Sequence, residues 1–248
     1  MKENVSSGGV RISKYSTART VLFMDRKDAL KELYPEAAFD NCSLSESAFI
    51  IVDMQKADAH EDYGFLRKAR EAGAGDSVAY YLNRIKTTLI PNIARLLALF
   101  RTTPAEVIYL KIESLTQDGR DRSLEHKRIG VHAPKGSPEA EILEEIAPEG
   151  DEIVISKTAS GAFNCTNLDY VLRNLGIRTL IVCGVLTNEC VESLVRDGAD
   201  RSYQVIVLED CCAAISEETH RNALQAMGAT YAQIMTSREL EEAAEAMR

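Results

Sequence analysis

The clearest structural signal in the chain is TLIVCGVLTNECV, residues 179–191. An apolar run rich in β-branched residues, then a glycine, then a helical pattern predicts a strand, a tight turn and a helix. Cys190 should therefore lie at the carboxyl end of the strand, in the first turn of the helix. Ligands bind beyond these strand ends in open parallel sheets, and a helix N-terminus lowers the pKa of a thiol. We expect Cys190 to be a reactive thiol in a ligand site.

Apolar strands and helical segments alternate along the rest of the chain. Near-continuous apolar strands between helices are typical of a parallel sheet that is covered on both faces. The prediction is an α/β fold with three layers, α/β/α, in which a Rossmann-like, mostly parallel six-stranded sheet has helices on both faces. Strands are expected at 48–52, 106–111, 151–156, 179–183, 204–208 and 232–235, helices at about 77–101, 138–146, 168–175, 190–199, 217–227 and the C-terminus, and a loop over 114–138.

Composition and patterning narrow the class of protein. Residues 1–45 are polar and weakly periodic, which predicts an N-terminal arm before one domain over 46–248. The net charge of −9 argues against nucleic acid or an anionic membrane as a partner. No apolar run reaches the roughly 20 residues of a membrane helix, and the N-terminus lacks a signal-peptide core. We expect a cytoplasmic protein that acts on a small molecule.

The six cysteines are expected to be free thiols, as is usual in a cytosolic chain of this size. No pair has the spacing of zinc ligands. The adjacent Cys211 and Cys212 are expected to pack in the core, and a strained redox pair is the alternative.

Three polar side chains are expected at strand ends: Asp53, Lys157 and Cys190. The ends of parallel strands meet at one edge of the sheet, so these residues can form a nucleophilic site. Lysine stabilises a thiolate, and aspartate accepts and returns a proton. Each residue also has a structural interpretation, as a helix cap, a solvated cation or a core thiol.

Four segments resemble the isochorismatase-like cysteine hydrolases, a superfamily that includes nicotinamidases, N-carbamoylsarcosine amidases, biuret hydrolases and ureidoacrylate amidohydrolases. The segments are IIVDMQ (50–55), ISKTASGAF (155–163), GVLTNECVES (184–193) and VLED (207–210), and the likeness extends over about 46–240. Residues 135–137 favour the biuret, triuret and ureidoacrylate branch over the nicotinamidases. The substrate implied is a small amide or ureide.

The resemblance implies a role for each residue of the predicted site. Cys190 would be the nucleophile, Asp53 the proton carrier and Lys157 the cation that stabilises the thiolate. The Val185–Leu186 peptide bond would be cis, and the N–H groups of Leu186 and Cys190 would form the oxyanion hole. Hydrolysis of a C–N bond would then pass through a thioester, without a metal or another cofactor.

One departure from the family concerns the pocket wall. Many members have an Asp-Phe pair after the first motif, where this chain has KADAH, residues 56–60. Asp58-Ala59-His60 has the spelling of a nicotinamidase metal site, but it follows Asp53 too closely. We therefore expect no metal there and a different wall.

Candidates for substrate binding are more dispersed. Phe163 and Asn164 match the place where family members line the pocket. The charged segment 118–128 is either a solvated loop or a lid whose Arg or Lys grips a carboxylate or ureido oxygen. The full set of candidates is Gln55, Glu113, Arg122, Lys127, Phe163 and Asn164.

The sequence leaves two alternative functions open. One is a nicotinamidase-like amidase, and the other is a family scaffold that binds a partner with its catalytic site idle. The resemblance also implies a homo-dimer or homo-tetramer. It does not identify which amide or ureide is the substrate.

Overall fold

The computed structural model describes residues 42–246, so the predicted arm over 1–45 lies almost wholly outside the described residues. Six strands form one sheet in which every neighbouring pair is parallel, in the order β3-β2-β1-β4-β5-β6. The prediction of a six-stranded parallel sheet is confirmed. The strands are β1 (Ser47–Val52), β2 (Glu106–Ile112), β3 (Ile153–Lys157), β4 (Thr179–Val185), β5 (Gln204–Ala213) and β6 (Gln233–Met235).

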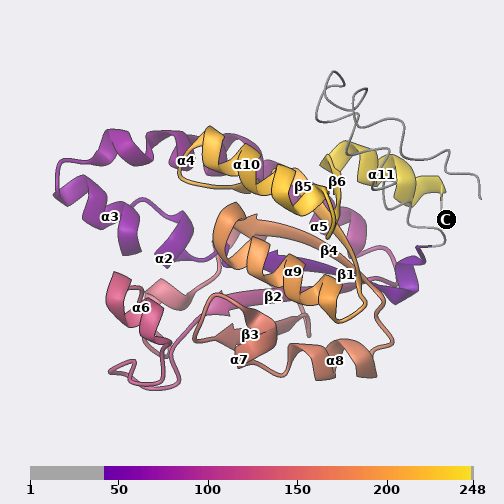
Figure 1. Ribbon diagram of the computed structural model, residues 1–248, viewed down its shortest axis with the longest axis horizontal. Coiled ribbons are helices and arrows are strands. Elements are labelled where there is room, and N and C mark those ends of the chain that lie inside the picture. Colours follow the sequence, from indigo (N-terminus) through magenta and orange to yellow (C-terminus); the bar gives the residue numbers. More distant parts are fainter. Residues whose placement is uncertain (1–41, 247–248) are drawn as a thin grey trace, which may run out of the picture. The chain divides into compact units, whose positions relative to one another are not determined.

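Helices cover both faces of this sheet (Figure 1). Alternate residues of β1 point to opposite faces: Phe49 and Ile51 belong to one apolar cluster, and Ile50 and Val52 to the other. All four are fully buried, which is why the strand reads as a continuous apolar run. One face carries α4 (Ala79–Arg84), α5 (Ile90–Phe100) and α11 (Ser237–Ala246), and the other α7 (Ala162–Cys165), α8 (Leu168–Asn174), α9 (Glu192–Asp200) and α10 (Glu217–Gly228).

Several predicted elements differ in detail. The long helix over 77–101 is interrupted by a π-helical segment, Ile85–Leu89. Residues 138–146 form two separate 3-10 turns, Pro138–Ala140 and Glu144–Ile146. The predicted loop over 114–138 contains a helix, α6 (Leu124–Ile129). Two helices after β1 were not predicted, α2 (Lys56–Ala59) and α3 (Gly64–Glu71). The two 3-10 turns and the helices α2, α3 and α6 have too few turns to produce a helical period in the sequence.

The strand order reverses its direction of growth between β1 and β4, and this is where ligands bind in doubly wound sheets. Gly184 allows the two strands to meet closely there. Its φ is +114°, and a Cβ atom would lie only 2.1 Å from the Val52 carbonyl oxygen. Only glycine fits this position.

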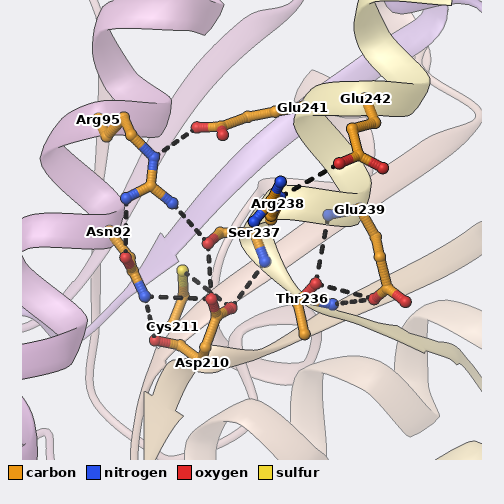
Figure 2. A network of polar contacts seen from close by, with 10 residues as sticks. All are labelled: Asn92, Arg95, Asp210, Cys211, Thr236, Ser237, Arg238, Glu239, Glu241 and Glu242. Atoms are coloured by element: carbon orange, nitrogen blue, oxygen red, sulfur yellow. Dashed lines mark hydrogen bonds and ion pairs between the residues drawn. The ribbon is translucent and has the colours of Figure 1, made fainter.

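The C-terminal helix is held to the sheet by a polar network around Asp210, in β5 (Figure 2). The Asp210 carboxylate accepts hydrogen bonds from the Ser237 backbone N–H at 2.7 Å and hydroxyl at 2.6 Å, and from the Asn92 amide at 3.1 Å. Arg95 joins α5 to the same serine at 2.7 Å and to Glu241 at 2.6 Å. Asp210, the last residue of the VLED segment (207–210), therefore anchors α11 to the sheet.

No helix within residues 42–246 is both long enough and apolar enough to span a bilayer. All six cysteines are free thiols. Cys211 and Cys212 are buried in opposite apolar clusters, so they pack as core residues in this structure.

Candidate active site

Lys157, the last residue of β3, lies between the other two predicted catalytic residues. Its ammonium nitrogen is 2.8 Å from Asp53 Oδ2 and 3.3 Å from Cys190 Sγ. It also donates to the Ala159 carbonyl at 3.2 Å. The exposed fractions are 0% for Lys157, 1% for Asp53 and 5% for Cys190. The fold thus brings together, in a buried cluster, three residues that are far apart in the sequence.

The ends of β1 and β4 hold the acid and the thiol. Asp53 directly follows β1, with its backbone in the left-handed region at φ +51°, and its N–H donates to the Leu110 carbonyl of β2 at 2.8 Å. Cys190 lies in a π-helical turn, Thr187–Val191, that leads into α9. The predicted strand, turn and helix start around Cys190 are therefore present. The Val185–Leu186 peptide bond is cis, as the family resemblance implied.

The electrostatics of the cluster differ from the expectation at Cys190. Burial raises the pKa of the Cys190 thiol well above its ordinary value, the negative Asp53 raises it further, and Lys157 opposes both. The sequence predicted a lowered pKa from the helix N-terminus, and the loss of hydration outweighs that effect. Burial also disfavours a charged Lys157, but Asp53 and Cys190 outweigh this and raise the pKa of its ammonium. Asp53 and Cys190 thus favour the charged form of Lys157, and burial favours the protonated form of the Cys190 thiol.

A cavity of about 240 Å³ opens onto Cys190 and Asp53. This is smaller than the ~300–1,000 Å³ typical of pockets for drug-sized ligands. Its apolar wall includes Phe65 from α3 together with Ile112, Val185 and Leu186. The cavity can hold only a small molecule, placed directly against the thiol.

Four carboxylates line the cavity: Asp53, Asp58, Glu125 and Glu189. Glu125 and Glu189 remain exposed to solvent, whereas the Oδ2 atom of Asp58 is buried and has no hydrogen-bond partner among the described residues. Burial, followed by the charge of Asp53, raises the pKa of Asp58 to about 8. The sequence motif suggested Asp58 only as a possible metal ligand, so its place in the pocket lining was not predicted.

Helix α6 brings Glu125 and His126 to the cavity. The Ser123 hydroxyl caps the helix by accepting the His126 N–H at 3.1 Å, and Gly130 ends it in the left-handed conformation. His126 is 2% exposed and its Nδ1 has no partner within residues 42–246. Burial lowers the pKa of His126, which keeps its ring neutral. The capping serine and the glycine were the sequence signals of this missed helix.

Phe163 and Asn164 do not line the cavity, contrary to the prediction. Phe163 packs into the apolar cluster under α9, with its ring 5.8 Å from that of Tyr203. The exposed Asn164 side chain donates to Asp197 Oδ2 at 3.1 Å. Both residues belong to α7, which turns their side chains toward α9 and away from the site.

Gln55 and Glu113 are also placed elsewhere. The buried Gln55 amide donates to the Ile112 carbonyl at 2.9 Å and accepts the Ile112 N–H at 2.5 Å. It ties the segment after Asp53 to β2, so its contacts are structural. Glu113 accepts from the Ser156 hydroxyl at 2.6 Å and from the Gly136 N–H at 2.9 Å, and these bonds lower its pKa although burial raises it.

Arg122 and Lys127 do not reach the cavity either. Arg122 Nε donates to the Gly119 carbonyl at 2.9 Å, and Lys127 Nζ to the Arg120 carbonyl at 2.6 Å. Both cations stabilise the segment around α6. The same segment approaches the site through Glu125 and His126, so its polar contribution to the lining is an acid and a neutral ring, beside the apolar Ile129 and Val131.

Within residues 42–246, no three His, Cys, Asp or Glu side chains are grouped so as to bind a metal ion. Asp58 and His60, which have the spelling of a nicotinamidase metal site, are therefore not part of such a group. His60 Nδ1 accepts the Asp62 N–H at 3.2 Å and its ring packs against Tyr63.

Comparison with known proteins gives a consistent result. The Isochorismatase domain model matches residues 47–239. Ureidoacrylate amidohydrolase RutB of Variovorax paradoxus (strain S110) is 34% identical over 183 residues, which are 67% of this chain and 68% of that protein. The protein of the same name from Agrobacterium fabrum is 31% identical over 188 residues, with 67% and 75% covered.

Two solved structures agree with this result. A cysteine hydrolase from Pseudomonas syringae pv. phaseolicola 1448A has 28% identity and a TM-score of 0.71, covering 84% of this chain and 96% of that one. N-carbamoylsarcosine amidase from Thermoplasma acidophilum has 25% identity and a TM-score of 0.60, covering 77% and 96%.

Proposed function

Because the chain belongs to the isochorismatase family, we propose that it is an amidohydrolase that cleaves its substrate through a thioester on Cys190. It is a hydrolase that acts on carbon–nitrogen bonds other than peptide bonds. The cysteine mechanism is supported by one observation above all: Lys157 bridges Asp53 and Cys190 in a buried cluster beside a small cavity.

In the first half of the proposed reaction, Cys190 Sγ attacks the carbonyl carbon of the substrate while its proton passes to Asp53. The raised pKa of Cys190 favours this transfer during attack over a thiolate formed in advance. The N–H groups of Leu186 and Cys190 stabilise the oxyanion. As the tetrahedral intermediate collapses, the C–N bond breaks and Asp53 returns the proton to the leaving ammonia or amine.

In the second half, water hydrolyses the thioester. Asp53 accepts a proton from the attacking water, the C–S bond breaks, and the thiol is regenerated with that proton. Lys157 stays protonated throughout and stabilises the negative charge, whether it resides on sulfur or on Asp53. The cycle consumes one water and leaves the protein unchanged.

The proposed substrate is a small ureide or amide, within the class of compounds that the ureidoacrylate, biuret, triuret and carbamoyl-amide hydrolases cleave. Support comes from the names of two relatives, a ureidoacrylate amidohydrolase and an N-carbamoylsarcosine amidase, and from the size of the cavity. A nicotinamidase-like activity is less well supported, because no relative reported above bears that name. The residues that would form its metal site are also not grouped within 42–246.

A cytoplasmic location and a homo-dimeric or homo-tetrameric state belong to the same proposal. Six free thiols agree with a reducing compartment.

The proposed function is tested by measuring ammonia release from a panel of ureides, carbamoyl amino acids and simple amides. We expect turnover of at least one ureide, and an acid-quenched reaction should carry an acyl adduct on the Cys190 peptide in mass spectrometry. An idle scaffold would release ammonia from none of the panel and acquire no adduct.

A further inference from the structure

We infer that the cavity selects an uncharged amide or ureide that donates an N–H group to Asp58, and that it rejects substrates that carry a carboxylate. This inference rests on the proposed function, because it names the substrate class of the same site. It separates this chain from ureidoacrylate, the substrate in the name of its curated relatives, since ureidoacrylate is an anion.

The lining of the cavity offers acidic groups and no cation. Four of the lining residues are Asp or Glu, and among the described residues no lysine or arginine is part of the lining. Lys157 lies beyond the wall, fully buried and occupied by Asp53 and Cys190. An anionic substrate would therefore lose its hydration without gaining a cationic partner, which is unfavourable.

The two cations that were expected to bind a substrate carboxylate are engaged elsewhere. Arg122 and Lys127 donate to backbone carbonyls of their own segment. The lining residues from that segment include Glu125 and the neutral His126. The segment thus brings negative charge toward the entering substrate, and the exposed Glu189 adds to it.

Asp58 has a buried oxygen atom without a hydrogen-bond partner among the described residues. The residue as a whole is partly exposed, and the buried atom is its Oδ2. Buried polar atoms normally have a partner, and a substrate N–H in the cavity would fill this role. Burial raises the pKa of Asp58 to about 8, so its carboxyl group is mostly protonated at neutral pH and ionised above pH 8.

Both protonation states of Asp58 suit an amide. An ionised carboxylate accepts N–H groups, and a protonated carboxyl both donates to a carbonyl and accepts from an N–H. An amide or ureide edge offers this combination of a carbonyl and an N–H. Asp58 belongs to the segment KADAH (56–60), which stands where many family members have an Asp-Phe pair.

The inference is tested without any turnover by alkylating Cys190 with iodoacetamide or iodoacetate. The two reagents have nearly the same size, but one is an uncharged amide and the other a carboxylate. The ratio of their rates is measured by mass spectrometry of the Cys190 peptide, with the partly exposed Cys165 as a control within the same molecule. Because the thiolate fraction affects both reagents equally, it cancels from the ratio.

We expect the preference for iodoacetamide to be at least about tenfold greater at Cys190 than at Cys165, or ~1.4 kcal/mol. Above pH 8, where Asp58 is ionised, Asp58→Asn should reduce this difference several-fold, whereas Glu145→Gln, at an exposed site outside the lining, should leave it unchanged. Equal preferences at the two cysteines, an unchanged ratio in Asp58→Asn above pH 8, or a Cys190 that reacts with neither reagent would each overturn the inference.

The alkylation experiment tests the charge selection separately from the proposed hydrolytic activity. A selective Cys190 in a protein that hydrolyses no ureide would support the charge selection and refute the activity. An unselective Cys190 in an active amidohydrolase would refute the selection alone.

Discussion

The Lys157 ammonium lies 2.8 Å from Asp53 Oδ2, and neither side chain is more than 2% exposed. A buried ion pair of this kind depends strongly on both partners, because removing one leaves the other as an uncompensated buried charge. The same ammonium group also contacts Cys190 Sγ at 3.3 Å. Lys157 is therefore expected to contribute both to the stability of the fold and to the proposed reaction.

Replacement of Lys157 by methionine should therefore destabilise the fold by about 3–5 kcal/mol. Adding Asp53→Asn should restore part of this loss, because it removes the unpaired anion. Urea denaturation of the three proteins measures the effect. Lys127→Met is the matched control: its exposed ammonium donates to the Arg120 carbonyl, and its loss should cost less than about 0.5 kcal/mol. Equal stability of Lys157→Met and the wild type would show that the pair is not needed for folding.

The Cys190 thiol should remain protonated at neutral pH and up to its ordinary pKa of 9.0. The measurement is the difference in ultraviolet thiolate absorbance between the wild type and Cys190→Ala during a pH titration. Asp53→Asn should lower the Cys190 pKa, because it removes a nearby negative charge that raises it. A thiolate already present at neutral pH in the wild type would contradict this account and favour an ion pair formed in advance.

Asp58 should make the fold less stable as the pH rises. Its pKa is 3.8 in the unfolded chain and about 8 in the fold, so the folded state binds more protons between these values. The free energy of unfolding then falls with pH across this window, by up to about 1.4 kcal/mol per pH unit. Asp58→Asn should remove this component, so the variant gains on the wild type from pH 4 to pH 8. Parallel stability curves for the two proteins in urea would disprove the assignment.

Asp210→Ala should loosen α11 without affecting the cavity. The variant loses the hydrogen bonds to the Ser237 N–H and hydroxyl and to Asn92, which should cost about 2–3 kcal/mol. Hydrogen exchange of the α11 amides should quicken relative to Glu242→Ala, which breaks only an exposed ion pair with Arg238. Alkylation of Cys190 should stay at the wild-type rate below the unfolding transition. Unchanged exchange in α11 would mean that the apolar contacts of Leu240 suffice.

The sequence predicted the parts of the fold that depend on long, regular apolar patterns. Every strand of the sheet is a buried apolar run, or an edge strand next to one, so period and burial agree. The predicted grouping of Asp53, Lys157 and Cys190 followed from a general property of parallel sheets, whose carboxyl strand ends share one edge.

The pocket lining was mostly missed, because it depends on short elements without a readable period. Glu125 and His126 reach the cavity only because α6 forms within a segment that was predicted to be a loop. Phe163 and Asn164 are close to Lys157 in sequence, but α7 turns them toward α9. The pKa of Cys190 was predicted in the wrong direction because the sequence reveals the helix start but not the depth of burial.

The central claim, that Cys190 is the nucleophile, is tested most directly by ammonia release from Cys190→Ala on the best ureide of the panel. We expect kcat/KM to fall at least about a thousandfold, ~4 kcal/mol in transition-state free energy, with an unchanged melting temperature. Cys183→Ala, at a buried thiol outside the site, controls for the loss of a core sulfur. A Cys190→Ala protein that retains hydrolysis within tenfold of the wild type would contradict the account.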